Sequence, residues 1–287
     1  MSVFSCLQEC RQLGIPIDQD LYTSLWMTLV AGRHLAVASP DPSKTAETIS
    51  YICNLWGFKE QTRTLNLEPG ISFEALAPLL HSKLAVVLFV NLEFTDSKFQ
   101  QELASYIDVH HGGRLSMVSV IANRNNIEVS LKQSLEKLIW LREVHRGEVP
   151  ETDNAPSCSA SQELETYRSR AKKVKIVREI KTYIYDIVVF TRMHRMVVAG
   201  LPTSTWKDME LFVQIYAAIH DMDYVTPAMV KLAAAKVIPL HIRMVSKPEQ
   251  EPTLLYGSDP RLVQQLVNVW DADLVVEDVL NNVQPPT

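Results

Sequence analysis

The chain has 287 residues, of which 47% are hydrophobic and 21% are charged, and its formal net charge is −5. This length can bury one sizeable core and a second, smaller one. The negative charge excludes a global positive field that would gather nucleic acid or anionic membranes. The four cysteines form no CxxC pair and no zinc-ligand spacing, and neither a cleavable signal nor a bilayer-spanning apolar run is present. We expect a globular protein of the cytoplasm and/or nucleus, without a membrane or a bound metal.

The pattern of the sequence changes along the chain and divides it into four parts. Residues 1–146 alternate short apolar runs with helical patterns from Pro16 onward, which is typical of a three-layer α/β core on a parallel sheet. Residues 147–173 begin in a polar, breaker-rich stretch that predicts a disordered linker. The pattern over 174–250 is helical throughout and predicts an all-α domain, followed by a C-terminal segment over 251–287.

The first strand, loop and helix of the core stand where a P-loop would lie. His34–Thr45 followed by Ala46–Trp56 predicts this succession of elements. The P-loop pattern G-x-x-x-x-G-K-[ST], laid on the loop, retains Lys44 and Thr45 but lacks both glycines. These two residues are the candidate nucleotide-binding residues. An ordinary strand–loop–helix junction with an exposed Lys-Thr pair explains the segment equally well.

The departures from the P-loop pattern should weaken phosphate binding. Ala38 and Ser43 replace the glycines, and Pro40 and Pro42 have no N–H to donate. Each charge-assisted hydrogen bond that is lost removes about 1.5 to 3 kcal/mol. Losing two or three of them lowers affinity by about three decades or more. We therefore expect no tightly bound cofactor, and ATP or ADP to be held weakly at most.

After this junction, the sequence predicts two further buried strands and several helices, and their order indicates a fold. Leu84–Val90 and Leu115–Ala122 are apolar runs that predict buried strands, and a helical pattern follows over Leu131–Trp140. The later stretches Val177–Arg192 and Asp223–Val230 predict helices, the second with a Thr-Pro start. This order resembles the AAA+ modules of MoxR and magnesium-chelatase ATPases, in which the later helices form a lid.

The resemblance implies a P-loop-NTPase-like fold, and it also implies where the ATP-hydrolysing residues should stand. The sensor 1 asparagine falls on Asn125 or Asn126, although an Asn-rich loop after a strand is also common turn chemistry. The other expected groups are replaced: Val90–Asn91 stands for the acidic pair, Lys137–Leu138 for the arginine finger and Leu201–Thr205 for the sensor 2 stretch. Without an acid at the strand end, nothing obvious holds Mg²⁺ or polarises the attacking water. The resemblance therefore implies a degenerate module with no catalytic residues.

A second resemblance lies at the C-terminus. The stretches Leu254–Val263 and Asp278–Thr287, together with Arg178–Arg195, resemble the fungal maintenance of telomere capping protein 2 family. That resemblance implies a link to telomere capping or maintenance, and it names no biochemical activity.

The C-terminal segment is too apolar for a solvated tail. Asp259–Pro260 predicts the cap and first turn of a helix that runs to Trp270. The segment either packs on the lid, which is slightly favoured, or presents an apolar face to another protein. The partner-binding candidates are Leu254, Leu255, Tyr256, Leu262, Val263, Leu266 and Trp270.

Arg168–Lys181 is a basic run leading from the linker into a helix. It is the only candidate for direct nucleic-acid binding. A solvated face or an acidic partner within the chain is favoured over nucleic acid.

The sequence therefore predicts a non-catalytic AAA+-like scaffold that binds protein partners. The first alternative is a slow or partner-activated MoxR-like ATPase that remodels a protein complex. The second is a telomeric nucleic-acid-associated factor. The sequence identifies neither the partner nor the oligomeric state.

Overall fold

The structure is a computed structural model that describes residues 2–80, 84–110, 115–122, 131, 133–146, 158–199, 201–251, 257 and 259–286. The chain divides into two compact units, Met1–Ser169 and Arg170–Thr287.

The first unit is built on a parallel sheet of five strands in the order β2-β3-β4-β1-β5. The strands are β1 (His34–Ser39), β2 (Thr62–Asn66), β3 (Val86–Val90), β4 (Ser116–Ala122) and β5 (Ile139–Val144). All five residues of β3 are buried, as expected of a continuous apolar run inside a parallel sheet.

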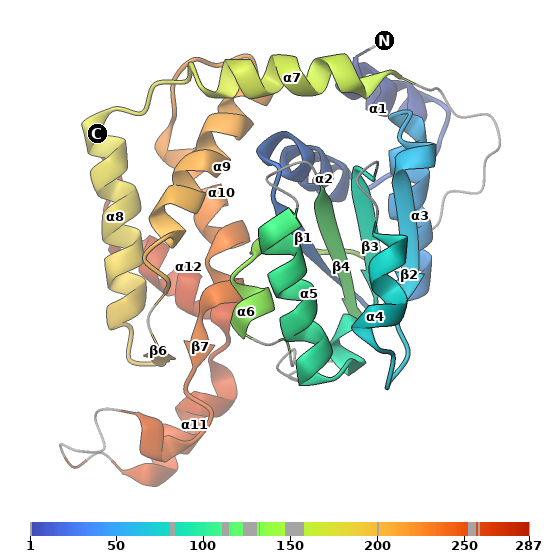
Figure 1. The fold of residues 1–287 in the computed structure, drawn as a ribbon. Coiled ribbons are helices and arrows are strands. Elements are labelled where there is room, and N and C mark those ends of the chain that lie inside the picture. Colours follow the sequence, from blue (N-terminus) through green and yellow to red (C-terminus); the bar gives the residue numbers. More distant parts are fainter. Residues whose placement is uncertain are drawn as a thin grey trace. The chain divides into compact units, whose positions relative to one another are not determined.

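Helices cover both faces of this sheet, giving three layers (Figure 1). The α-helices are α1 (Val3–Gln12), α2 (Gln19–Ala31), α3 (Pro42–Leu55), α4 (Phe73–Leu76), α5 (Ser97–His110), α6 (Gln133–Glu136) and α7 (Ala160–Ala171). Short 3-10 turns are η1 (Lys59–Gln61), η2 (Ala77–Leu79) and η3 (Leu92–Phe94). α2 packs against β1 and β5, and α3 packs against β1, β2, β3 and β4. α5 lies in front of the sheet in Figure 1. The predicted three-layer α/β core is confirmed.

The prediction of a helix over Leu131–Trp140 is wrong for part of this stretch. Within the described residues of this stretch, only Gln133–Glu136 is helical, and β5 begins at Ile139. Ile139, Trp140 and Leu141 are buried, and β5 pairs with β1. The apolar residues that suggested a helical face instead complete the sheet.

The disordered linker predicted over residues 147–173 is corrected in its second part, where α7 forms. Residues 147–157 lie outside the described residues. Arg168 of α7 donates to the carbonyl oxygens of Val30 at 3.0 Å and Leu29 at 2.9 Å, at the C-terminal end of α2. The ring of Tyr167 packs edge-on against Trp26. These tertiary contacts, rather than its own polar sequence, account for the helix.

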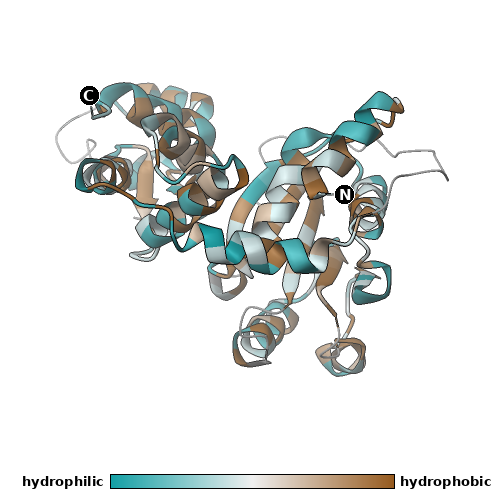
Figure 2. Ribbon diagram, turned by 90° about the horizontal axis from the view of Figure 1, so that it is seen from above, coloured by the Kyte–Doolittle hydropathy of each residue, from teal (hydrophilic) through white to brown (hydrophobic). Residues whose placement is uncertain are grey.

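The second unit is mainly helical. Its helices are α8 (Arg178–Met193), α9 (Thr205–Ile219), α10 (Pro227–Val237), α11 (Pro260–Val269) and α12 (Ala272–Asn282), with 3-10 turns η4 (Pro239–His241) and η5 (Pro248–Gln250). The unit also contains an antiparallel pair, β6 (Val197–Ala199) and β7 (Arg243–Met244), which the all-α prediction missed because strands this short carry no periodicity. Figure 2 shows helices of both units banded in teal and brown, as amphipathic helices are.

The last helix belongs to the core of the helical unit. Val275, Val276 and Val279 of α12 are buried, and α12 packs against α8 and α10. The caps also form as the sequence predicts: Thr226 accepts the N–H of Met229 at the start of α10.

Candidate functional site

The candidate site is the carboxyl edge of the parallel sheet, where ligands bind in folds of this class. Its centre is the junction between β1 and α3. Only Pro40 and Asp41 separate the last residue of β1, Ser39, from the first residue of α3, Pro42. A loop this short leaves little backbone to wrap around a phosphate.

Asp41 caps α3 with its own carboxylate. Oδ1 of Asp41 accepts the N–H of Lys44 at 3.2 Å, and the same carboxylate also accepts the N–H of Ser43. The N–H of Thr45 bonds the carbonyl oxygen of Asp41 at 3.1 Å, and the N–H of Asp41 bonds the hydroxyl of Ser39 at 3.1 Å. Because Pro42 has no N–H, every donor of this first turn is already used inside the chain.

The side chain of Lys44 is also committed to Asp41. Its Nζ lies 3.3 Å from Oδ2 of Asp41, and both side chains are largely exposed. The hydrogen bond from the Lys44 N–H, reinforced by the Lys44 side chain, holds the pKa of Asp41 below its ordinary value. A helix N-terminus normally attracts an anion, and here the chain supplies that anion itself.

Thr45 turns away from solvent. Its hydroxyl donates to the hydroxyl of Ser39 at 2.7 Å and lies 3.1 Å from Nδ1 of His145, just beyond β5. Thr45 is fully buried, and the N–H of His145 bonds the carbonyl oxygen of Ala38 at 2.9 Å. In a P-loop this hydroxyl faces Mg²⁺, whereas here it ties β1, α3 and β5 together.

The end of β3, which β4 separates from β1 in the sheet, carries an amide where the resemblance expects an acid. Asn91 has a φ of 64°, and its Nδ2 donates to Oδ1 of Asn66 at 3.0 Å. The next carboxylate along the chain belongs to Glu93 in η3, and its Oε1 accepts the N–H of Ala122, at the end of β4, at 2.8 Å. Oε2 of Glu93 is buried and has no hydrogen-bond partner within the described residues.

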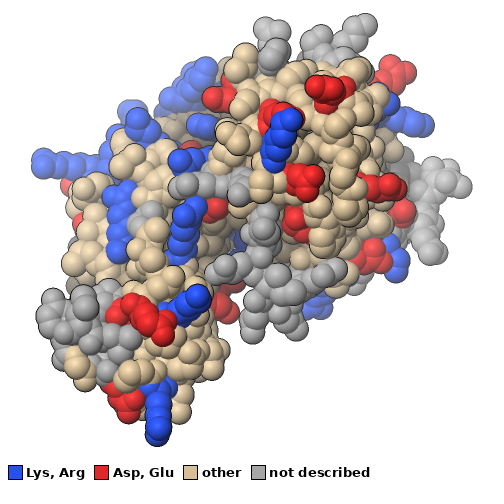
Figure 3. Space-filling model, turned by 60° about the horizontal axis from the view of Figure 1, so that its bottom comes forward, with Lys and Arg blue, Asp and Glu red and all other residues tan. Residues whose placement is uncertain are grey.

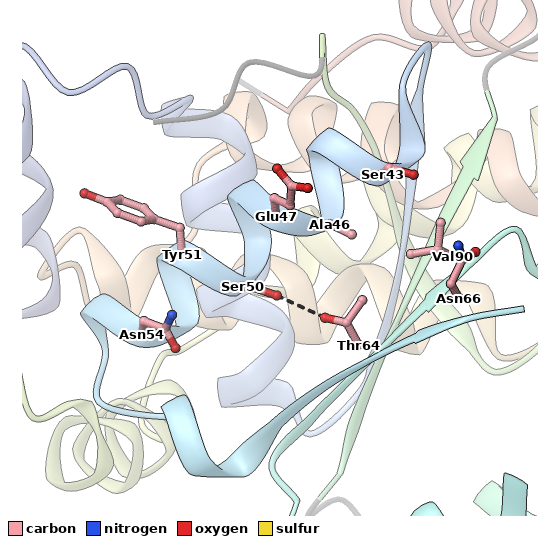
Figure 4. A pocket seen from close by; sticks show the side chains of 9 residues that line it. All are labelled: Ser43, Ala46, Glu47, Ser50, Tyr51, Asn54, Thr64, Asn66 and Val90. Atoms are coloured by element: carbon pink, nitrogen blue, oxygen red, sulfur yellow. Dashed lines mark hydrogen bonds between the residues drawn. The ribbon is translucent and has the colours of Figure 1, made fainter. Parts of the chain in front are cut away.

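A groove of about 490 Å³ lies between α3 and β2 (Figure 4). It is lined by Ser43, Ala46, Glu47, Ser50, Tyr51, Asn54, Thr64, Asn66 and Val90. Ser50 of α3 points to Thr64 of β2, and their hydroxyl oxygens are 3.1 Å apart. Among the described residues of the lining, Glu47 is the only charged side chain, so these residues offer no cation to a phosphate.

The structure brings Lys44 and Thr45 together at this junction and places them as parts of an internal cap. Asn125 lies outside the described residues. The sequence did not predict the roles of Ser39, Asp41 and His145. An Asp followed by Pro at a helix start is a recognisable cap signal. The contact between Thr45 and His145, which are 100 residues apart, has no such signal in the sequence.

The partner-binding candidates fall into three groups. Leu254, Leu255 and Tyr256 lie outside the described residues. Val263 is buried, while Leu266 and Trp270 are half-buried. Leu262 is 59% exposed. Val263 therefore packs inside its own unit, which corrects its place among residues that could contact a partner.

The described part of the chain contains neither a membrane-spanning helix nor a cluster of metal ligands. No helix there is long and apolar enough to cross a membrane. Nor do three or more His, Cys, Asp or Glu side chains gather there in an arrangement that could hold a metal ion.

A scan against protein-family models found no match. The chain is similar to fungal proteins named maintenance of telomere capping protein 2. The relative from Lachancea thermotolerans is 31% identical over 142 residues, which cover 42% of this chain and 50% of the relative. The relative from Kluyveromyces lactis is 31% identical over 96 residues, covering 32% of this chain and 35% of the relative. The chain thus matches half or less of these relatives' length.

Among solved structures, the chain resembles a protein from Cytophaga hutchinsonii named a "putative ATPase". The TM-score is 0.73, and the match covers 99% of this chain and 96% of that one. Because the sequence identity is 12%, the likeness shows the fold alone. The chain therefore shares its overall fold with that protein, with a parallel α/β core and helical parts as the sequence predicted.

Proposed function

We propose that this chain is a non-catalytic, AAA+-like scaffold of the MoxR type, a pseudo-ATPase that works through protein partners. The observation that carries the proposal is the self-capped first turn of α3, in which the Asp41 carboxylate takes the N–H groups that a phosphate would need. The name of the fungal relatives favours a role in telomere capping or maintenance and a place in the nucleus, with the cytoplasm as the alternative.

The chemistry of the junction supports a non-catalytic role. A nucleotide phosphate would have to displace a carboxylate of the same sign and break its bonds to the N–H groups of Ser43 and Lys44. Pro40 and Pro42 could not supply replacements. Each lost charge-assisted bond costs about 1.5 to 3 kcal/mol, so affinity falls by roughly one to two decades per bond.

Nucleotide titration and turnover measurements on the purified chain test this proposal. We expect no saturable binding of ATP or ADP below about 1 mM, and turnover below about 0.1 per second. Lys44→Ala is the matched variant, and it should change neither quantity. Turnover above that level that disappears in Lys44→Ala would overturn the proposal.

A second candidate, a partner-activated ATPase, is favoured by one specific observation. The buried Oε2 of Glu93 has no hydrogen-bond partner within the described residues, and it lies at the carboxyl edge of the sheet. A partner that ordered a water molecule there would give this carboxylate a role as a base. If the complex isolated from cells hydrolyses ATP, Glu93→Gln should abolish that activity, whereas Glu102→Gln on the exposed side of α5 should not.

Direct nucleic-acid binding is a third candidate, carried by exposed cations of the helical unit. Figure 3 shows Lys and Arg side chains gathered over this unit, at the left of the view. In the basic run, Arg170 pairs with Asp221, while Lys172, Lys173 and Lys175 are exposed and form no ion pair among the described residues. We expect only non-specific affinity for single-stranded DNA, weaker than about 10 µM at physiological salt, by fluorescence anisotropy. Tighter, sequence-dependent binding would favour this candidate over a scaffold.

A further inference from the structure

Three thiols meet at one point in the core of the α/β unit. Cys6 and Cys10 stand one turn apart on α1, and both are buried. Cys158, just before α7, comes from the far end of the unit's sequence and is held there by the bond from its N–H to the carbonyl oxygen of Leu55 at 2.8 Å. The Cys6 thiol is in hydrogen-bond contact with both Cys158 and Cys10.

The surroundings hold α1 in place beside this cluster. The hydroxyl of Tyr22 donates to the carbonyl oxygen of Val3 at 2.7 Å and accepts the indole N–H of Trp56 at 2.6 Å. The N–H of Val3 bonds a carboxylate oxygen of Glu163 in α7 at 3.0 Å. Contacts from α2 and α7 therefore hold α1, which carries Cys6 and Cys10, in place beside Cys158.

We propose that Cys6 and Cys158 are an oxidation site, at which a small peroxide converts the two thiols into a disulfide that joins α1 to the start of α7. Cys10 is the poorer partner for Cys6 on geometric grounds. Side chains one turn apart on a helix have Cβ atoms about 5 to 6 Å apart. A disulfide needs Cβ atoms roughly 3.5 to 4.5 Å apart.

The reaction uses both thiols and one peroxide molecule. The Cys6 thiolate attacks a peroxide oxygen, so that an S–O bond forms, the O–O bond breaks and, with hydrogen peroxide, water leaves after protonation. The Cys158 sulfur then attacks the resulting sulfenic acid; the S–S bond forms, the S–O bond breaks and a second water leaves. The two thiols lose two electrons, which the peroxide gains.

The hydrogen bonding within the cluster assigns these roles. The hydrogen bond from Cys158 lowers the pKa of Cys6, which favours the thiolate there. The same bond, together with burial, raises the pKa of Cys158, and burial raises that of Cys10 to about 12. Cys6 is thus the attacking sulfur, and Cys158 is the resolving one.

Cys53 provides an internal control. It is fully buried in α3, and burial raises the pKa of its thiol to about 12. It shares the environment of the core and lacks the thiol neighbours. If burial alone governed reactivity, Cys6 and Cys53 would be oxidised at the same rate.

The test treats the folded full chain with hydrogen peroxide, blocks remaining thiols under denaturing conditions and maps the peptides by mass spectrometry. We expect a Cys6–Cys158 linked peptide, formed at least about tenfold faster than any oxidation of Cys53. The linkage should persist in Cys10→Ser and be absent in Cys158→Ser. Oxidation should also raise the melting temperature of the native chain and of Cys10→Ser but not that of Cys158→Ser, because a disulfide restricts the unfolded chain.

Three outcomes would overturn the proposal. One is equal oxidation rates for Cys6 and Cys53. Another is a Cys6–Cys10 linkage as the product. The third is complete protection of Cys6 and Cys158 in the folded chain, with linkage appearing only after denaturation. Because the Cys10→Ser and Cys158→Ser variants each retain Cys6, a folding defect of a Cys6 variant does not affect the result.

Discussion

A single carboxylate, that of Asp41, occupies the free N–H groups at the β1–α3 junction. A helix N-terminus has a few free N–H groups, and a capping side chain and a bound anion compete for them. The Asp41 carboxylate occupies these N–H groups because it belongs to the same chain. Unlike a free anion, it loses no translational or rotational entropy on binding. The retained Lys44 and Thr45 then serve the local fold.

The capping role of Asp41 can be measured by substitution. We expect Asp41→Ala to lower the melting temperature by a few degrees, whereas Asp41→Ser, which keeps a capping oxygen and removes the charge, should retain most of the stability. The folded pKa of Asp41 lies below its ordinary value of 3.8. Its stabilisation is therefore present above that value and disappears as the pH falls through the folded pKa. Equal melting temperatures for the native chain and Asp41→Ala at pH 7 would contradict the assignment.

His241 makes the helical unit sensitive to acid. Burial lowers the pKa of its imidazole to about 4 from 6.5. Because the unfolded chain binds the proton more readily, stability is full above pH 6.5 and falls as the pH drops toward 4. The loss amounts to about 3 kcal/mol. Urea unfolding at several pH values should show a shallower decline in His241→Phe, and no such change in His220→Gln on the exposed end of α9. A native chain with constant stability between pH 6.5 and 4 would exclude this role.

At the scale of elements, strands buried on both faces were predictable and the others were not. The apolar runs of β1, β3 and β4 are recognisable as strands in the sequence. β2 is not, because it is a half-exposed edge strand with polar residues. β5 follows directly on a helical turn, so its apolar residues merged with a helical pattern. α7 was missed because its stability comes from residues distant in sequence, such as Val30 and Trp26. At the candidate site, the positions of Lys44 and Thr45 were predictable, but their bonding partners were not.

The anchoring of α7 by Arg168 gives a test at this scale. Arg168→Ala removes two charge-assisted bonds to the end of α2, and its guanidinium is only partly exposed. We expect the free energy of unfolding of the α/β unit to fall by about 2 kcal/mol. Denaturant titration followed by tryptophan fluorescence would report it, since Trp26 packs against Tyr167 of the same helix. The neighbouring Lys172→Ala should leave the transition unchanged; an equal effect of both variants would contradict the anchor.

At the scale of the whole molecule, the last helix of each unit packs against helices from earlier in the same unit. In the α/β unit α7 returns to α1 and α2, as the bond between Val3 and Glu163 shows. In the helical unit α12 returns to α8 and α10. His194 joins the two C-terminal helices to α8: its ring lies 5.1 Å from that of Trp270, and its Nε2 lies 3.4 Å from Oδ2 of Asp278.

The two C-terminal helices should therefore respond differently to substitution. Val276 of α12 is buried, and Val276→Asp places an unpaired charge in the core, at a cost of roughly 3 to 5 kcal/mol. The exposed neighbour Glu277→Ala is its control and should be neutral. On α11, Leu262 and Val269 are 59% and 68% exposed and lie two turns apart on one face. Replacing both by Asp should leave the melting temperature unchanged.

The double α11 variant tests whether this face binds a protein partner. Apolar side chains in solvent at helical spacing are suited to the groove of another protein. We expect Leu262→Asp combined with Val269→Asp to abolish co-purification of partners from cells, while deletion of residues 251–287 abolishes co-purification and lowers the melting temperature as well. Loss of α12 removes buried valines from the core, so that only the deletion should affect folding. If the deleted chain matched the native one in both melting temperature and co-purified partners, the segment would be a passive tail.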